Sequence, residues 1–547
     1  FHHRTDFGVH VLLTLHCILL ALAPNALAIE PASVLTHHHL IVTLHPDDHS
    51  LIAEDTITFH HPTGMPDVLE LYLNKNLLID EILLNGSRIS HEKDRVDVQT
   101  REGEHRLRVS LHGTEHLASS PSITIRYHGM IDDQPKGKPG LRFTSPDKTT
   151  GYIGPKGVYL TSETLWFPTV IDALATFQVR TTVPSGWESV TQGKETSHIT
   201  SQGQTTSEWN MPRPTEALTL AANQFVKKER QWNGITLATY LFQEDAQLAE
   251  QYLDATAMYL DMYTQLLGPY PFSKFAVVEN FFPSGIGLPS FTLLGNRIIK
   301  RGYTQPYSLG HEIVHSWFGN SVFNHFSNGN WVEGLTTYLS NYYYEEVYAS
   351  GSTALKKRQQ MSFEYNLYTT GQNEYPVRKF HHKETRIDNA IGYQKTAMLF
   401  HMLRQEVGDE HFFNSIRMLI TKWTEKHADW TSIEHVFTET TGQDLSWFFT
   451  QWVDQSGAPS INITKAEVIE GIPGDLTIEG HTDNVPIRTD RFYSNWDLSA
   501  ARAAAVANVL VARDQVEPTR LSVTGLADTE PRVENTSAEN RARNRRV

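Results

Sequence analysis

The stretch "HEIVHSWFGN", residues 311–320, contains residue types that could hold a metal ion. His311 and His315 are four positions apart, so on a helix they share one face, one turn from each other. Two imidazoles placed in this way can bind one Zn²⁺, and Glu312 beside them can direct its carboxylate at a water on that ion. The chemistry expected from such a site is metal-assisted hydrolysis. The alternative is a core helix that carries two histidines by chance.

A third ligand should come from another helix, and the candidate is Glu333 in "NWVEGLTTYLS", 18 positions after His315 (333 − 315 = 18). Three protein ligands would leave a fourth position for water, whose pKa a bound Zn²⁺ lowers to about 7. The alternative is structural. Asn330 could cap this helix, and Glu333 would then be the partner carboxylate of a capping box.

The first 28 residues have the layout of a secretory signal peptide. Arg4 precedes an apolar run from residue 9 to 22, and small residues at Ala26 and Ala28 predict cleavage after Ala28. The run is shorter than the ~20 residues that span a bilayer. It also contains Cys17, the one cysteine of the sequence, so a cleaved protein would have none. Any metal would then be held by His, Asp and Glu.

Length and charge restrict the possible functions further. A chain of 547 residues predicts two to four domains. A net charge of −15 argues against a nucleic-acid partner, which would need clustered Lys and Arg. The histidine runs at 37–39, 60–61 and 381–382 are expected to lie on the surface.

The hydrophobic pattern changes along the chain. Residues 34–226 read as short alternating strands separated by Gly, Pro, Asn and Asp, which predicts an all-β, sandwich-like domain. Residues 244–268 have apolar residues at spacings of three and four, which predicts an amphipathic helix. Two short strands follow, and helices are expected from 308 to about 453. After a loose stretch at 457–476, the tail reads as a strand, a helix near 498–513 and a second strand.

Together, "HEIVHSWFGN" and "NWVEGLTTYLS" resemble the gluzincin aminopeptidases, the family of aminopeptidase N and leukotriene hydrolase, and most of all a bacterial short form. The resemblance covers about residues 33–457. It implies a β domain followed by a thermolysin-like α+β, mostly helical catalytic domain, with Glu333 as the third zinc ligand. Seventeen residues separate His315 from Glu333, one fewer than is usual in the family. The deletion is expected in the loop "NHFSNGN".

The same resemblance implies the remaining catalytic groups. Glu312 would take a proton during attack on the scissile carbonyl and pass it to the leaving amine. Tyr393, in "GYQKTAMLF", stands where the family has the tyrosine that stabilises the oxyanion. Thr396 replaces the usual glycine after it. The alternative for Tyr393 is ordinary helix packing.

The substrate strand departs from the family pattern. In "ENFFPSGIGLPSFTLLG", residues Gly285, Gly287, Leu288 and Pro289 are the predicted substrate-binding positions. Pro289 stands where the family has a Glu that binds the α-ammonium of the substrate, and Pro has neither a charge nor a backbone N–H. Peptide hydrolysis is therefore expected, while exopeptidase specificity rests on the resemblance alone. Glu279 upstream could substitute, but an ordinary carboxylate at a strand end is the preferred interpretation.

The tail, from "IEGHTDNVPIRTDRFYSNWDLSAARAAAVANVL" to "NRRV", resembles the OmpA/MotB-type peptidoglycan-binding domain. In that family an Asp and an Arg bind the diaminopimelate of the cell-wall peptide, and the matching positions are Asp483 and Arg502. An Arg fork suits a carboxylate and an Asp suits an ammonium. The first strand and helix and the last strand of the family domain are missing, so we expect a partial α/β module with exposed edges.

We therefore predict a signal peptide (1–28), a β domain (29–228), a zinc peptidase domain (229–457), a linker (458–474) and a partial OmpA-like segment (475–547). The expected function is peptide-bond hydrolysis with one Zn²⁺ per chain, held by His311, His315 and Glu333. The expected location is the periplasm, or the outer membrane or cell wall, of a Gram-negative bacterium. The partners would be a peptide substrate and peptidoglycan. The alternative is a non-catalytic, peptidoglycan-associated binding protein that retains the peptidase fold.

Overall fold

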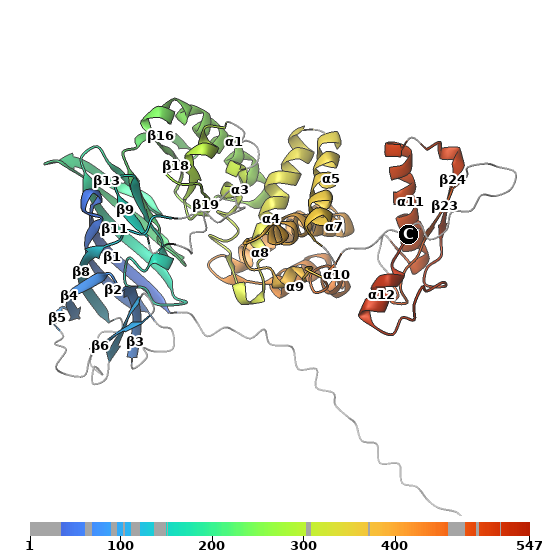
Figure 1. The fold of residues 1–547 in the computed structure, drawn as a ribbon, viewed down its shortest axis with the longest axis horizontal. Helices are drawn as coiled ribbons and strands as arrows, with labels where there is room; N and C mark the ends of the chain where they lie inside the picture. The colour runs from blue at the N-terminus through green and yellow to red at the C-terminus, as the bar shows by residue number, and fades with distance from the viewer. Residues whose placement is uncertain are drawn as a thin grey trace, which may run out of the picture.

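A computed structural model describes residues 34–60, 68–88, 96–101, 104–110, 121–135, 149, 151–301, 308–349, 351–369, 372–457, 476–487, 492–514 and 516–547. The predicted signal peptide and linker lie outside these residues. Among the helices in the described part of the chain, none is both long enough and apolar enough to cross a membrane. Figure 1 shows a β domain, a mostly helical domain and a small tail in chain order.

The N-terminal part is built from strands, as predicted. β1 alternates buried and more exposed residues along its length, because successive side chains of a strand point to opposite faces of the sheet. The main sheet has eight strands in the order β13-β14-β11-β1-β2-β8-β4-β5, and sheets of four strands (β12-β15-β10-β9) and three strands (β3-β7-β6) accompany it. The large sheet and its neighbours share one apolar core with the domain that follows.

The strand bounds of this domain are β1 Leu35–His45, β2 Ser50–His60, β3 Val68–Asn74, β4 Leu77–Leu84, β5 Ser87–Arg88, β6 Val96–Arg101, β7 Glu104–Ser110, β8 Ser122–Met130, β9 Tyr152–Gly154, β10 Gly157–Leu160, β11 Leu174–Pro184, β12 Glu188–Val190, β13 Lys194–Ser201, β14 Gln204–Thr215 and β15 Leu220–Asn223.

One surface prediction in this domain is wrong. His38 is buried, with 2% of its surface exposed, whereas the histidine run at 37–39 was expected on the surface. Its Nδ1 lies 2.7 Å from Asp55 Oδ2 and its Nε2 lies 3.1 Å from Thr36 Oγ1. Both ring nitrogens are thus satisfied inside the sheet, which makes burial of this polar ring tolerable. The alternation of β1 explains why His38 is buried, since successive residues of a strand point to opposite faces and cannot all face solvent.

The second domain begins with a five-stranded sheet in the order β16-β17-β18-β20-β19. Its strands are β16 Val226–Trp232, β17 Ile235–Leu241, β18 Lys274–Asn280, β19 Gly285–Leu288 and β20 Phe291–Gly295. The domain boundary predicted between residues 228 and 229 therefore falls inside β16. The predicted amphipathic helix is present as α1 (Ala249–Leu267), preceded by a 3₁₀ turn and ended by Gly268, whose φ of 103° favours glycine.

Helices make up most of the rest of this domain, as expected. Their bounds are α2 Asn296–Ile299, α3 Ser308–Val314, α4 Val332–Thr337, α5 Gly351–Tyr368, α6 Arg386–Asp388, η10 (a π-helical segment) Asn389–Lys395, α7 Thr396–Val407, α8 Asp409–Trp423, α9 Trp430–Thr441 and α10 Ser446–Trp452, with two further π-helical segments at Tyr338–Tyr343 and Glu345–Ala349 and a short strand pair, β21 Phe323–Asn324 with β22 His427–Ala428.

Polar contacts join the β domain to the second sheet. Lys274 on β18 donates from Nζ to the carbonyl oxygen of Thr191 at 2.6 Å. The backbone N–H of Gly193 donates to Ser290 Oγ at 2.9 Å. Ser290 is fully buried and lies between β19 and β20, so the β domain contacts the turn that joins these two strands.

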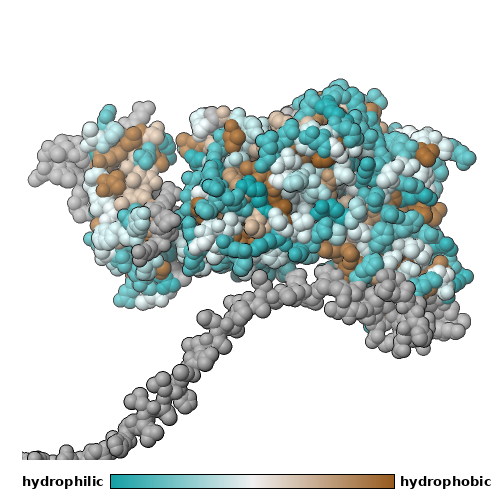
Figure 2. Space-filling view, turned by 180° about the vertical axis from the view of Figure 1, so that it is seen from behind, coloured by the Kyte–Doolittle hydropathy of each residue, from teal (hydrophilic) through white to brown (hydrophobic). Residues whose placement is uncertain are grey.

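The tail forms a small α/β unit with its own core. β23 (Leu476–Gly480) pairs in parallel with β24 (Leu521–Gly525), and α11 (Asn495–Asp514) packs on both, followed by α12 (Ala538–Asn544). The core is small and consists of Ile478, Ala503 and Val547. Brown hydrophobic patches are visible over the tail in Figure 2. The exposed large apolar residues of the tail are Val485, Tyr493, Trp496, Val509 and Val523.

Candidate metal centre

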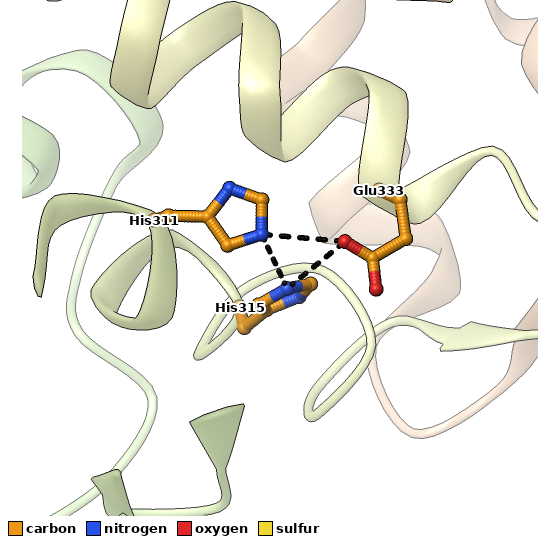
Figure 3. A group of neighbouring side chains, drawn as sticks. All are labelled: His311, His315 and Glu333. Atoms are coloured by element: carbon orange, nitrogen blue, oxygen red, sulfur yellow. Dashed lines mark hydrogen bonds and ion pairs between the residues drawn. The ribbon is translucent and has the colours of Figure 1, made fainter. Parts of the chain in front are cut away.

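Two neighbouring helices bring the three predicted ligands together. His311 lies on α3 and His315 follows its last turn, while Glu333 lies in the first turn of α4. Figure 3 shows the two imidazole rings and the carboxylate directed at a common space. The His311 Nε2 is 3.2 Å from Glu333 Oε2 and 3.2 Å from His315 Nε2, and the His315 Nε2 is 3.6 Å from Glu333 Oε2.

These separations fit a zinc ion. Four donors at 2.0–2.1 Å from a tetrahedral Zn²⁺ lie about 3.3 Å from one another, close to the three distances observed. The far ring nitrogens also have partners, because His315 Nδ1 lies 3.1 Å from the Phe318 carbonyl oxygen and His311 Nδ1 lies 3.5 Å from Ser340 Oγ. A proton on each Nδ1 leaves both Nε2 lone pairs facing each other, an arrangement that a cation between them stabilises. The donor set therefore fits one Zn²⁺ per chain.

The electrostatics of the site also favour a cation. Burial lowers the pKa of His315, but the hydrogen bond to Glu333 and its negative charge raise it to about 9. Burial opposes ionisation of Glu333, yet its two imidazole partners hold the pKa of this carboxylate well below the usual range. Glu312 is 7% exposed, and burial raises its pKa while His311 and His315 oppose that effect. A carboxylate with a raised pKa beside a metal site is suited to accept a proton.

The structural alternative for Glu333 does not describe this helix. Trp331 is the N-cap residue of α4, and its own side chain makes no capping hydrogen bond. The Asn330 side chain accepts from the N–H of Val332, the first residue of α4, at 3.1 Å and donates to the carbonyl oxygen of His381 at 2.8 Å. The Glu333 carboxylate does not complete a capping box with it, because its oxygen lies against His311 and His315. Glu333 is thereby available to the histidines.

The predicted substrate strand lies directly beside the metal ligands. Gly285, Gly287 and Leu288 belong to β19, which forms the edge of its sheet among the described strands. A Cβ at Gly287 would lie 2.8 Å from Glu312 Oε2 and 3.0 Å from His315 Cβ, so only glycine lets β19 approach this closely. The edge of β19 is thus positioned to pair with an extended peptide near the metal site.

Pro289 and Glu279 are the two residues that bear on the binding of a substrate ammonium group. Pro289 follows β19 as a buried residue of the turn into β20 and offers no charge. Glu279 on β18 is almost fully buried and accepts a hydrogen bond from the Phe242 N–H at 2.8 Å. Burial raises its pKa, and neighbouring Asp245 adds to the effect. Its described contacts are therefore with the segment that leads into α1.

Tyr393 lies beside the ligands on η10. Its ring is nearly parallel to that of His311, with centroids 6.3 Å apart. Burial raises the pKa of its hydroxyl well above the usual value, and the charges of Glu333 and Glu312 add to this effect, so the hydroxyl keeps its proton at neutral pH. A protonated hydroxyl at this place can donate a hydrogen bond to a developing oxyanion.

The structure adds a residue that the sequence did not indicate. Lys383 is half-buried, and its Nζ lies 4.6 Å from the centre of the Tyr393 ring. Burial lowers the pKa of its ammonium group, while the charges of Glu333 and Glu312 raise it. Lys383 lies ten positions before Tyr393 in a segment without helical or strand periodicity, so no sequence pattern marks it.

In the tail, the two predicted ligand-binding residues lie close together. Asp483 is 6% exposed and forms an ion pair with Arg545, a partner that the sequence did not indicate although it lies in the quoted "NRRV". Arg502 donates to the His481 carbonyl oxygen at 3.3 Å, and burial lowers its pKa to about 10. Asp483, Arg502 and Arg545 line a cavity of about 860 Å³ together with residues of α7 and α10.

Both the helical domain and the tail match known protein families. Residues 306–452 match the Peptidase family M1 domain, and residues 460–545 match the OmpA family. The M1 zinc metallopeptidase from Deinococcus radiodurans has a similar fold, with a TM-score of 0.60 at 18% identity, and the match covers 77% of this chain and 94% of that structure. At this level of sequence identity, the match establishes that the two proteins have a similar fold.

Curated proteins match the two parts separately. Aminopeptidase N of Lactococcus lactis subsp. lactis is 27% identical over 168 residues, which are 30% of this chain and 19% of that protein. Motility protein B of Bacillus subtilis is 39% identical over 75 residues, which are 14% of this chain and 29% of that protein. The chain thus spans about a third or less of the length of the curated relatives that it matches.

Proposed function

Because the chain contains a Peptidase family M1 domain followed by an OmpA family segment, we propose that it is a zinc-dependent peptidase with a peptidoglycan-binding tail. The observation that carries the proposal is the meeting of His311, His315 and Glu333 at tetrahedral donor separations. The position of Glu312 and of the edge strand β19 beside this centre supports it.

The roles of the side chains follow from their positions. When bound, Zn²⁺ supplies Lewis-acid chemistry and makes hydroxide available near neutral pH. Glu312 accepts the proton of the attacking water and passes it to the leaving amine, a role that suits its raised pKa. Tyr393 donates a hydrogen bond to the oxygen of the scissile carbonyl as that oxygen gains charge. The edge of β19 holds the peptide in an extended conformation.

Metal analysis and Glu312→Gln test the proposal. We expect about one zinc per chain in both proteins, and a loss of at least about 10³-fold in kcat/KM on a peptide library in the variant, because the amide cannot accept the proton. Glu410→Gln, an exposed change on α8, is the matched control and should keep full activity. If the wild type binds no zinc, or cleaves peptides no faster than the Glu312 variant, the non-catalytic binding protein becomes the better description.

The requirement for a free amine is a separate question within this proposal. In the resembled family a Glu binds the substrate ammonium, and Pro289 occupies that position here. Peptides of one sequence with a free or an acetylated N-terminus measure what this change does. Cleavage of both at similar rates assigns an endopeptidase-like mode, and loss of cleavage on acetylation assigns an aminopeptidase.

We also propose that the protein acts in the bacterial envelope, at the cell wall. Two features support this location, the signal-peptide pattern of residues 1–28 and the OmpA family segment. In the tail, the acidic Asp483 and the basic Arg502 offer complementary charges for the ammonium and carboxylate groups of a diaminopimelate residue. Localisation of the tagged full-length protein by cell fractionation tests the proposal, and recovery in the cytoplasm would reject it.

A further inference from the structure

Tyr393, which would donate to the developing oxyanion, lies on a helical segment of uncommon geometry. The segment η10 is π-helical and continues directly into α7 at Thr396. The Thr396 hydroxyl donates to the Ile391 carbonyl oxygen, five positions earlier, at 2.8 Å. Turns of this kind are rare and occur frequently at functional sites. Contacts with neighbouring segments are therefore needed to hold η10, and with it Tyr393, in this form.

Two glycines let η10 and the start of α7 pack closely against their neighbours. A Cβ at Gly392 would lie 2.3 Å from the Phe380 ring, and a Cβ at Gly334 would lie 2.0 Å from Thr396 Cγ2. Gly334 directly follows Glu333 on α4. These contacts hold η10 against the helix that carries a metal ligand and against the chain around Phe380.

Lys395, the last residue of η10, reaches a distant part of the chain. Its Nζ donates to the Gly457 carbonyl oxygen at 2.7 Å and lies 5.6 Å from the centre of the Tyr365 ring on α5. Gly457 follows α10 at the C-terminal end of the peptidase domain. The side chain is half-buried, and burial lowers the pKa of its ammonium group to about 8, while the charge of Glu374 opposes this shift. A lysine placed only for solubility would keep its strongly hydrated ammonium group in water.

The contacts of Lys395 lie close to Tyr393 in the chain. Gln394, between the two residues, donates to Glu364 Oε2 on α5 at 3.1 Å. The end of η10 is thus held by two side chains that point away from the metal site towards other segments. Misplacing a catalytic group by about 1 Å can cost about 100-fold in rate. The anchoring of this short segment is therefore expected to matter for the hydroxyl of Tyr393.

We propose that Lys395 is a positioning residue, whose hydrogen bond to Gly457 holds η10 so that the Tyr393 hydroxyl faces the oxygen of the scissile carbonyl. The inference rests on the proposed peptidase function and assigns a further residue to it. Lys395 acts through Tyr393 and not on the substrate itself. Its effect belongs to the transition state, where the carbonyl oxygen gains charge.

Kinetics of the full-length protein on one peptide test the proposal. Lys395→Met removes the ammonium group and keeps most of the length of the side chain. It should lower kcat by about 10–100-fold, with KM changed less than about 3-fold and the zinc content unchanged. Lys395→Arg can still donate to the Gly457 oxygen and should lose less than about 3-fold in kcat. Lys379→Met removes an exposed lysine and is the control that should change nothing.

A double-mutant cycle with Tyr393→Phe separates positioning from a general effect on the fold. If Lys395 acts through Tyr393, adding Lys395→Met to Tyr393→Phe should lower kcat by less than about 3-fold further. Losses that multiply would overturn the proposal, because Lys395 would then act independently of Tyr393. A rise in KM at unchanged kcat, or a loss of zinc, would overturn it as well. If Lys395→Met does not fold, Lys395→Gln, which is one atom shorter than lysine, is measured in the same cycle.

Calorimetry with a phosphinic peptide gives a test that does not depend on turnover. This peptide carries a charged oxygen on tetrahedral phosphorus in place of the scissile carbonyl oxygen, so its affinity reports the hydrogen bond from Tyr393. Lys395→Met should weaken its binding by at least about 10-fold, but by less than about 3-fold in a Tyr393→Phe background. If the wild type cleaves no peptide but this pattern is present, the proposed peptidase function fails while the positioning role stands. Equal binding by the wild type and Lys395→Met rejects the positioning role.

Discussion

Replacing Lys274 by Met is expected to make the stability of the protein less dependent on pH between 7 and 10. This lysine lies on β18 at the contact between the β domain and the second sheet and is 2% exposed. Its Nζ donates to the Thr191 carbonyl oxygen and lies 4.4 Å from the centre of the Trp209 ring. Burial lowers the pKa of this amine to about 7.

The sign and size of this pH dependence follow from the difference in the pKa of Lys274 between the folded and the unfolded protein. The pKa of Lys274 is lower in the folded protein than its ordinary value of 10.5, so the unfolded chain binds more protons and the free energy of unfolding rises with pH. The difference between 10.5 and about 7 corresponds to about 5 kcal/mol in total, of which about 3–4 kcal/mol falls between pH 7 and pH 10. A methionine side chain has no titratable group, so the variant lacks this contribution to the pH dependence of the free energy of unfolding. The lost hydrogen bond to Thr191 is a cost of about 1–3 kcal/mol at every pH.

Urea unfolding of the wild type and the variant at several pH values between 7 and 10 measures the effect. The stability of Lys274→Met relative to the wild type should increase by about 3–4 kcal/mol as the pH falls from 10 to 7. Lys228→Met, at a lysine that is 44% exposed on β16, is the control and should give a nearly constant difference. A difference for Lys274→Met that does not change with pH would refute the reasoning, because the buried amine would then keep its ordinary pKa.

The metal ligands were predictable because their spacing is local. Positions four apart on a helix must share a face, so His311 and His315 meet whatever the rest of the fold does. The role of Glu333 as a ligand was predictable only through the resemblance. Its partners lie on another helix, and a capping box is equally compatible with the same sequence. The order of the β-rich, helical and OmpA-like parts is confirmed by the fold and the family matches, and the three predicted ligands meet in a group that could hold a metal ion.

The rest of the site depends on contacts between distant segments, which no local pattern encodes. Lys383 reaches Tyr393 because its segment is tied to the loop before α4 by hydrogen bonds to Asn330 and Phe326. The burial of Lys274 against Trp209 likewise depends on how two domains pack. No local pattern in the sequence marks either lysine as buried, and buried lysines are rare.

Two further substitutions test the remaining parts of the molecule. Asp483→Ala in the full-length protein should reduce binding to purified sacculi by at least about 10-fold, because the ligand ammonium loses its counter-ion, and retention equal to that of the wild type would assign the tail another role. Tyr393→Phe should lower kcat by about 10²–10³-fold with KM and zinc content nearly unchanged. Phe keeps the ring that lies parallel to His311 and beneath Lys383, so the variant removes the hydroxyl alone. If kcat falls less than about 3-fold, Tyr393 only packs against the site, since an oxyanion donor acts in the transition state and its loss must appear in kcat.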